Sequence, residues 1–164
     1  MTAVDKGSNA PLALIADDDG TMRAILREVL EQAGFRVAEA DDGRAALSRF
    51  EELRPDVVLL DVEMPLMDGY TVCERIRAAN ELRDTPVFII TGRDDPQSIE
   101  QAYNVGATDF ISKPIAWPLL AHRVRFVMRA SDALNEIKGL VRAIPDRIAV
   151  LDSAGEPCMP LASA

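Results

Sequence analysis

The chain has 164 residues, of which 48% are hydrophobic and 27% are charged, and its formal net charge is −9. This composition is typical of a globular protein that can fill a core, and it excludes disorder over the whole length. Because contacts to nucleic-acid phosphates need clustered Lys and Arg, we expect this acidic region to make no contact with nucleic acid.

The sequence carries no sign of export or of a membrane segment. No basic N-terminal stretch is followed by a long apolar run, and no apolar run approaches the roughly 20 residues that span a bilayer. Cys73 and Cys158 lie far apart and are predicted to be free thiols. We therefore expect a cytoplasmic protein in a reducing compartment, with no membrane contact.

Short apolar runs alternate with amphipathic stretches along most of the chain. The runs predict strands at Leu12–Ala16, Arg36–Ala40, Val57–Asp61, Val87–Thr91 and Asp109–Ile111. The stretches between them predict helices at Thr21–Ala33, Gly43–Leu53, Tyr70–Ala79, Pro96–Val105 and from near Ala116. Five successive strand–helix units predict an α/β fold, with a doubly wound five-stranded parallel sheet and helices on both faces.

The two ends of the chain have a different character. Residues 1–11 are small and polar and are predicted to form a flexible arm. In the last helix, apolar residues recur at steps of three and four, with Arg123 in one slot. They are Leu120, Val127, Ala130, Leu134, Ile137, Val141 and Ile144. The first turns of this helix are expected to pack on the domain's own sheet. Beyond Arg129 the heptad seam favours pairing with a second copy or a linker role, and the alternative is a helix folded back on its own domain.

Polar residues stand where the predicted strands end. Asp17, Asp18 and Asp19 follow the first strand, Asp61 ends the third, Thr91 ends the fourth and Lys113 follows the fifth. In a parallel sheet these ends share one edge, where ligands bind. Two carboxylates about 4 Å apart repel by roughly 4 kcal/mol at an effective dielectric constant near 20, so such a cluster favours binding a cation. Oxygen ligands of this kind suit Mg²⁺.

A carboxylate beside Mg²⁺ is able to act as a nucleophile on phosphorus and form an aspartyl phosphate. Lys113 is suited to pair with the bound phosphoryl group as a point charge, and Thr91 is suited to donate a hydroxyl hydrogen bond to it. Asp19 has a second interpretation, as the N-cap of the first helix. His122, the single histidine, is predicted to be a surface or packing residue of the last helix.

Four motifs resemble those of response-regulator receiver domains. They are Leu14-Ile15-Ala16-Asp17-Asp18, Leu59-Leu60-Asp61-Val62-Glu63-Met64-Pro65-Leu66-Met67-Asp68-Gly69, Ile89-Ile90-Thr91-Gly92 and Phe110-Ile111-Ser112-Lys113-Pro114. The resemblance covers roughly Pro11 to Val127, with the motifs in order and at the expected intervals. It implies a flavodoxin-like receiver fold over residues 12–129. Gly92 departs from the Ala that many family members have at this position.

The resemblance implies a role for each site residue. Asp61 would be the phosphoacceptor. Mg²⁺ would be held by Asp17, Asp18, Asp61 and the backbone carbonyl of Glu63. Lys113 would hold the phosphoryl oxygens, while Thr91 and Phe110 would form the switch pair. The phosphoryl donor would be a sensor histidine kinase or a phosphotransfer protein, and the domain would not be a turnover enzyme.

Two other functions remain open from the sequence. Asp17-Asp18-Asp19-Gly20-Thr21 is similar to the first motif of haloacid-dehalogenase-type phosphatases, with Asp17 as nucleophile and Asp19 as acid/base. That interpretation leaves Asp61 unexplained, and Asp152 is a poor candidate for the further metal-binding acid. The third possibility is a degenerate receiver that serves only as an interaction module, which the intact acids and Lys113 disfavour.

The parts that pass the signal on are expected at one face of the receiver and in the segments that follow it. We expect the face formed by the fourth helix, fifth strand and fifth helix to respond to phosphorylation, and a homodimer to form through a helical linker at residues 130–144. Pro145 is predicted to end the helix. Residues 145–164 are predicted to be a disordered tail or the start of a PAS-like domain, because Leu140–Glu156 resembles the opening of a PAS-type sensor domain. The chain would then be the N-terminal part of a longer regulator.

Overall fold

The computed structural model describes residues 10–79, 84–92 and 96–143, with the side chains of residues 141–143 left out. The chain divides into two compact units, residues 1–131 and residues 132–164. The first unit contains the sheet and the candidate site. None of the helices within the described ranges combines the length and apolar character that crossing a membrane requires.

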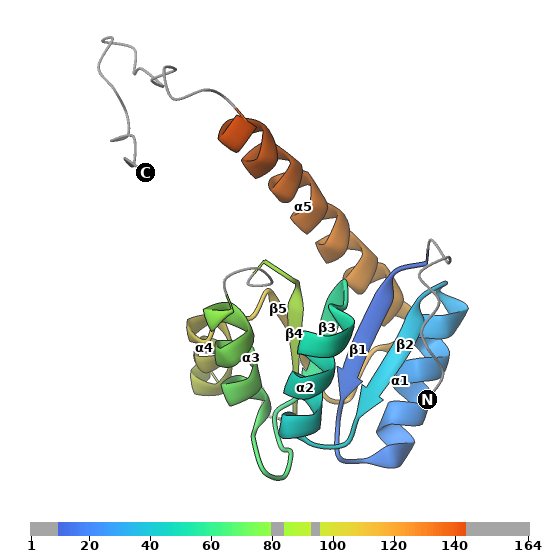
Figure 1. Ribbon diagram of the computed structural model, residues 1–164. Coiled ribbons are helices and arrows are strands. Elements are labelled where there is room, and N and C mark those ends of the chain that lie inside the picture. Colours follow the sequence, from blue (N-terminus) through green and yellow to red (C-terminus); the bar gives the residue numbers. More distant parts are fainter. Residues whose placement is uncertain (1–9, 80–83, 93–95, 144–164) are drawn as a thin grey trace. The chain divides into compact units, whose positions relative to one another are not determined.

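Strands and helices alternate along the chain (Figure 1). The strands are β1 (Leu12–Ala16), β2 (Arg36–Ala40), β3 (Val57–Asp61), β4 (Val87–Thr91) and β5 (Asp109–Ser112). The helices are α1 (Gly20–Gln32), α2 (Gly43–Leu53), α3 (Gly69–Ala78), α4 (Pro96–Asn104) and α5 (Trp117–Ala143). The predicted fold class is confirmed. The predicted end of the fifth strand was one residue short, because Ser112 still pairs with Thr91.

The five strands form one parallel sheet in the order β2-β1-β3-β4-β5. This is the flavodoxin-like order, in which the chain reverses direction across the sheet at β1 and β3. The two central strands are in register from Ala13 opposite Val57 to Ala16 opposite Leu60. The residues after Ala16 and Leu60 are Asp17 and Asp61, so the topology brings these two carboxylates to neighbouring positions at one edge.

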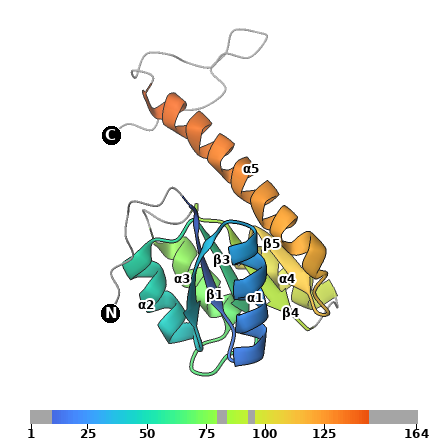
Figure 2. The same cartoon turned by 90° about the vertical axis from the view of Figure 1, so that its right-hand side faces the viewer.

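Each face of the sheet is covered by its own hydrophobic cluster. Alternate residues such as Leu60 and Ile89 pack with α2, α3 and α4, whereas Leu59 and Phe88 pack with α1 and the first turns of α5. Figures 1 and 2 show α1 on the opposite side of the sheet from α2 and α3. Strands β1, β3 and β4 are buried at every position, which explains their continuous apolar sequence.

Three helices begin directly after an aspartate that caps them. Asp19, Asp42 and Asp68 accept hydrogen bonds from backbone N–H groups in the first turns of α1, α2 and α3. Such capping compensates the unpaired donors at a helix N-terminus and contributes about 1 kcal/mol per helix. The caps explain why α1 and α3 start one residue earlier than the hydrophobic pattern predicted.

The first turns of α5 pack against the sheet, as expected for the start of the last helix. Leu120 is 2% exposed, and Val127 packs against the same cluster, so both residues belong to the domain's own core. Leu119 and Phe126 are exposed instead. The spacing alone describes which residues share a face, and the position directly after the fifth strand indicates that the first part of that face contacts the sheet.

The part of α5 that belongs to the second unit has exposed apolar side chains at Leu134, Ile137 and Leu140. The helix continues to Ala143, and Ile144 lies outside the described residues. The predicted N-terminal arm lies outside them as well, except for its last two residues. The predicted tail or PAS-like segment at residues 145–164 and Cys158 also lie outside, whereas Cys73 is buried with a free thiol.

Candidate functional site

The predicted site residues meet at one edge of the sheet. Asp17 directly follows β1, Asp61 ends β3, Thr91 ends β4 and Lys113 directly follows β5. Asp17, Asp61 and Thr91 are 1%, 4% and 3% exposed. Within the described part of the chain they are the only fully buried polar or charged side chains. Burying a polar or charged side chain without partners costs free energy. The concentration of three such side chains at one edge of the sheet therefore indicates a functional site.

Lys113 links the two buried carboxylates. Its Nζ lies 2.7 Å from Asp61 Oδ1 and 3.5 Å from Asp17 Oδ2. The other oxygen of Asp61, Oδ2, accepts a hydrogen bond of 2.8 Å from the backbone N–H of Glu63. The backbone N–H of Lys113 donates to the Thr91 carbonyl over 2.8 Å, which ties the residue after β5 to the end of β4. Both oxygens of Asp61 are therefore held in place.

Burial and neighbouring charges shift the pKa values of both Asp61 and Lys113. Burial raises the pKa of the Asp61 carboxyl, and the Asp17 charge adds to this, while the hydrogen bond from Lys113 opposes it. For Lys113, burial lowers the pKa, but its contacts with Asp61 and Asp17 outweigh burial, so its pKa lies above the ordinary value. Lys113 thus remains a cation at neutral pH. The protein groups around Asp61 offset only part of the cost of burying its negative charge.

Three carboxylates of the site are arranged to share a cation. Asp17, Asp18 and Asp61 each offer an oxygen, and these atoms all lie within 4.8 Å of one another. Asp17 Oδ2 is buried and has no hydrogen-bond partner among the described residues; Lys113 approaches it only to 3.5 Å. An all-oxygen set with one unsatisfied buried acceptor fits a hard divalent cation such as Mg²⁺.

Comparison with known families accounts for this arrangement. The model of the response regulator receiver domain family matches residues 13–125. The chain belongs to this family. The match includes every predicted site residue and ends within α5. It establishes the protein as a receiver domain of two-component signal transduction, as the four sequence motifs predicted.

Relatives and solved receiver structures agree. The chain is 34% identical over 126 residues to the DNA-binding dual master transcriptional regulator RpaA of Synechocystis, covering 77% of this chain and 52% of RpaA. It thus spans about half the length of that relative. A response regulator from Chloroflexus aurantiacus is 32% identical with a TM-score of 0.71, covering 74% of this chain and 99% of the other. CheY4 of Vibrio cholerae is 30% identical with a TM-score of 0.69, covering 73% of this chain and 99% of CheY4.

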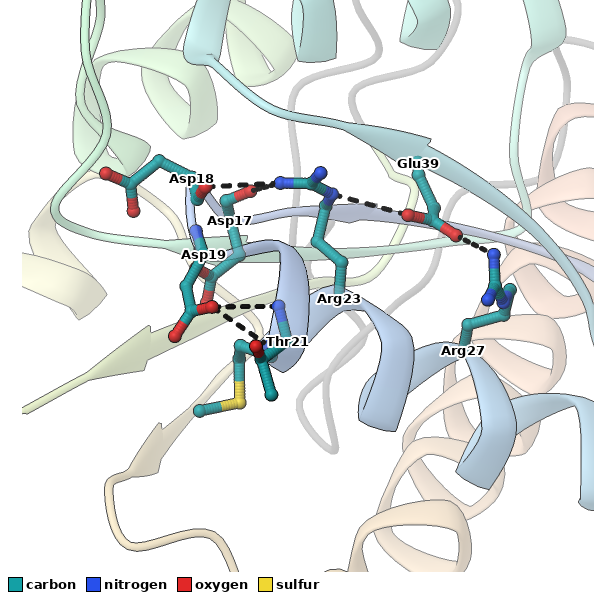
Figure 3. A network of polar contacts seen from close by, with 8 residues as sticks. Asp17, Asp18, Asp19, Thr21, Arg23, Arg27 and Glu39 are labelled. Carbon is teal, nitrogen blue, oxygen red and sulfur yellow. Dashed lines mark hydrogen bonds and ion pairs between the residues drawn. The ribbon is translucent and has the colours of Figure 1, made fainter.

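Asp19 of the receiver is engaged at the helix terminus. Its Oδ1 accepts hydrogen bonds from the N–H groups of Thr21 at 2.8 Å and Met22 at 3.4 Å (Figure 3). Its own N–H donates to Asp17 Oδ1 over 2.9 Å. The capping interpretation of Asp19 is confirmed by these contacts.

The predicted switch residues lie on adjacent strands. Thr91 is buried at the end of β4, and Phe110 is partly buried in β5. The Phe110 ring meets the ring of the exposed Tyr103 on α4 edge to face, with centroids 5.9 Å apart. His122 is exposed on α5, as predicted. The Tyr103 contact was not expected from the sequence, because no spacing rule relates these residues.

Arg23 was also missed by sequence analysis. It lies in the first turns of α1, and its Nη1 donates to the carbonyl oxygens of Asp17 and Asp18 at 2.7 and 3.3 Å. Its Nε lies 3.3 Å from Glu39 on β2, and Glu39 in turn lies 2.7 Å from Arg27 (Figure 3). The sequence does show a basic residue four positions after the run of three aspartates, but basic residues are also common on solvent-exposed helix surfaces.

Proposed function

We propose that this receiver domain accepts a phosphoryl group on Asp61 from a sensor histidine kinase or a phosphotransfer protein. The observation that carries the proposal is the buried Asp61 carboxylate, which lies 2.7 Å from Lys113 at the sheet edge where Asp17 and Asp18 also lie. The domain takes one phosphoryl group per signalling event and loses it slowly by hydrolysis. It is thus a phosphoacceptor and not a turnover enzyme.

The transfer itself needs a positioned nucleophile and counter-charges. One oxygen of Asp61 attacks the phosphorus and forms a P–O bond, while the bond from phosphorus to the donor's histidine nitrogen breaks and its electron pair leaves with the donor. The Lys113 ammonium, already beside Asp61 Oδ1, pairs with the phosphoryl oxygens. The Thr91 hydroxyl donates a hydrogen bond to one of them. These groups approach from three strands, so the folded sheet positions them together.

Asp17, Asp18, Asp61 and the backbone carbonyl of Glu63 are the groups we assign to Mg²⁺. When bound, the ion supplies positive charge that offsets the carboxylates and the incoming phosphoryl oxygens. The unsatisfied Asp17 Oδ2 and the grouping of three carboxylate oxygens support this assignment. The raised pKa of Asp61 supports it too, because the carboxylate lacks full compensation from the protein alone.

Phosphorylation acts on the face formed by α4, β5 and α5. A phosphoryl group adds about −1.5 to −2 charge, which favours a conformation in which Thr91 turns toward it. The resulting space lets the Phe110 ring move inward from its contact with Tyr103. Thr91 and Phe110 form the switch pair in this proposal, and the tie between Lys113 N–H and the Thr91 carbonyl couples β4 to β5.

A second copy of the chain is the partner we assign to α5. Residues 12–129 form the receiver in this proposal, and residues 130–144 form a helical linker that pairs in a homodimer. The exposed Leu134, Ile137 and Leu140 support pairing, because apolar side chains at helical spacing are stabilised by burial against a partner. The linker would pass the change at the α4, β5 and α5 face to an output segment.

Phosphorylation of the wild type and of Asp61→Asn by acetyl phosphate, followed by intact mass measurement, tests the acceptor. We expect the wild type to gain one phosphoryl group only when Mg²⁺ is present, and Asp61→Asn to gain none. Modification of Asp61→Asn at the wild-type rate would contradict the assignment.

Turnover and analogue binding separate the alternatives. Sustained hydrolysis of a phosphate monoester that is lost in Asp17→Asn and kept in Asp61→Asn would support the phosphatase function. Absence of Mg²⁺-dependent beryllofluoride binding in the wild type would support a degenerate receiver. Light scattering with and without beryllofluoride tests the dimer, and an unchanged monomeric mass in both states would exclude the proposed pairing.

A further inference from the structure

Arg23 contacts the backbone from which the acidic ligands project. Its guanidinium donates to the carbonyl oxygens of both Asp17 and Asp18, and the side chain is only 20% exposed. We propose that Arg23 is a positioning residue that fixes the loop between β1 and α1, so that the two carboxylates face a divalent cation. This inference rests on the proposed Mg²⁺ site and names a residue outside the assigned ligand set.

The loop has anchors at both ends, and Arg23 holds its centre. At one end, the N–H of Asp17 donates to the Ala40 carbonyl over 3.3 Å. At the other, Asp19 caps α1. Between these anchors, the described contacts that hold the carbonyls of Asp17 and Asp18 are those from Arg23. The Asp17 carboxylate is held by the Asp19 N–H at Oδ1 and approached by Lys113 at 3.5 Å from Oδ2, which has no hydrogen bond, so its position depends on the loop backbone that carries both Asp17 and Asp19.

Glu39 keeps the arginine in place. It lies between Arg23 and Arg27, at 3.3 and 2.7 Å, and is itself 28% exposed (Figure 3). A planar guanidinium has donors that point in fixed directions, so one side chain can serve the two carbonyls and the carboxylate together. A lysine at this position has a single nitrogen on a flexible stem and does not reproduce that geometry.

Positioning and simple electrostatics predict opposite effects. A positive charge near three carboxylates disfavours binding of a cation, so removal of Arg23 on charge grounds alone would tighten Mg²⁺ binding. If Arg23 positions the loop, its removal loosens the ligands and weakens binding. Groups behind the ligands of a metal site typically contribute about 10- to 100-fold to metal affinity. The sign of the change therefore distinguishes the two effects.

Calorimetric titration of the full chain with Mg²⁺ measures this sign. We expect the dissociation constant to rise about tenfold in Arg23→Met and at least about threefold in Arg23→Lys, which keeps the charge. Arg27→Met is the matched control, because Arg27 lies on the same helix and shares Glu39, whereas the hydrogen bonds to the loop carbonyls among the described residues come from Arg23. We expect its Mg²⁺ affinity to stay within about twofold of the wild type.

Phosphorylation by acetyl phosphate at increasing Mg²⁺ provides a second readout. We expect Arg23→Lys to need more Mg²⁺ for half-maximal rate and to approach the wild-type rate at saturation. Equal or tighter Mg²⁺ binding in both folded Arg23 variants would overturn the positioning role. Wild-type Mg²⁺ binding that is absent, or unaffected by Asp18→Asn, would instead count against the proposed metal site itself. Thermal unfolding identifies any variant that is not folded, and Arg23→Lys is the variant that retains most of the packing.

Discussion

Gly69 lies directly against the backbone of Asp61. Its N–H donates to the Val62 carbonyl over 3.1 Å, and a Cβ added to Gly69 would lie 2.2 Å from the Asp61 carbonyl oxygen. No real Cβ approaches an oxygen so closely, so the start of α3 or the end of β3 must move if this residue gains a side chain. The position of the acceptor aspartate therefore depends on the absence of a side chain eight residues later in the sequence.

We predict that Gly69→Ala destabilises the domain by about 1–3 kcal/mol, because the added methyl group overlaps backbone and not a movable side chain. Urea unfolding measures this change. Phosphorylation by acetyl phosphate should slow as well, since the displaced backbone carries Asp61. Wild-type stability together with wild-type phosphorylation would show that the contact is not maintained in solution.

Gly92→Ala should behave differently. Gly92 follows Thr91, and a Cβ added to it would meet no atom of the described residues within 4 Å. Since its φ lies outside the left-handed region, alanine fits the backbone, and the unfolded chain loses conformational freedom. We expect the free energy of unfolding to stay unchanged or to rise by up to about 1 kcal/mol. A loss of more than that amount would indicate a constraint near Thr91 that the static geometry does not show.

Asp61→Asn is predicted to stabilise the domain at pH 7 in the absence of Mg²⁺, by on the order of 1 kcal/mol. The folded environment raises the Asp61 pKa mainly through burial, which means that it disfavours the charged form. This deficit is complete above the folded pKa, shrinks as the pH falls through it because the folded carboxyl takes up a proton first, and is gone below the ordinary value of 3.8. The two proteins should therefore converge in stability toward acidic pH.

Thermal unfolding across pH, with and without Mg²⁺, measures this convergence. The cation should stabilise the wild type more than Asp61→Asn, because the variant lacks one carboxylate ligand. A stability difference that grows toward acidic pH would contradict the cause we assign to the raised pKa of Asp61.

Lys113→Met removes the cation that the two buried carboxylates share. We expect a loss of about 1–3 kcal/mol without Mg²⁺, since Asp61 Oδ1 loses its 2.7 Å partner. The folded pKa of Lys113 is raised, so its contribution is complete below the ordinary lysine pKa of about 10.4 and is lost only as the pH rises through the folded value. Chemical unfolding at pH 7 and above pH 10 tests this. A loss that already vanishes near neutral pH would be inconsistent with it.

Leu119 and Leu120 form a matched pair on α5. Leu120 is 2% exposed in the core, whereas Leu119 is 63% exposed. We expect Leu120→Ala to lower the free energy of unfolding by about 2–5 kcal/mol and Leu119→Ala to change it by less than about 0.5 kcal/mol. Urea unfolding of the two variants, at protein concentrations where the chain is monomeric, measures the difference. Equal losses would mean that the first turns of α5 do not pack as described.

The sequence predicted most of the fold and the positions of the site residues, for physical reasons. Strands buried on both faces have continuous apolar sequences, and parallel strands end at one edge, so Asp17, Asp61, Thr91 and Lys113 were expected to meet. The function of Arg23 was not predictable, because it depends on contacts from a side chain to backbone carbonyls. The packing of Leu120 on the sheet was also expected, because the first turns of the last helix follow directly on the fifth strand.

β5 is the last strand in the sequence and lies at the edge of the sheet, and this order has a consequence for synthesis on the ribosome. The acids after β1 and at the end of β3 are made long before Lys113, which follows the last strand. A nascent chain that has not yet produced β5 can bring Asp17 and Asp61 together only against their mutual repulsion. Translation through Lys113 supplies the compensating charge, so the complete charge set of the site becomes available only when the sheet itself is complete.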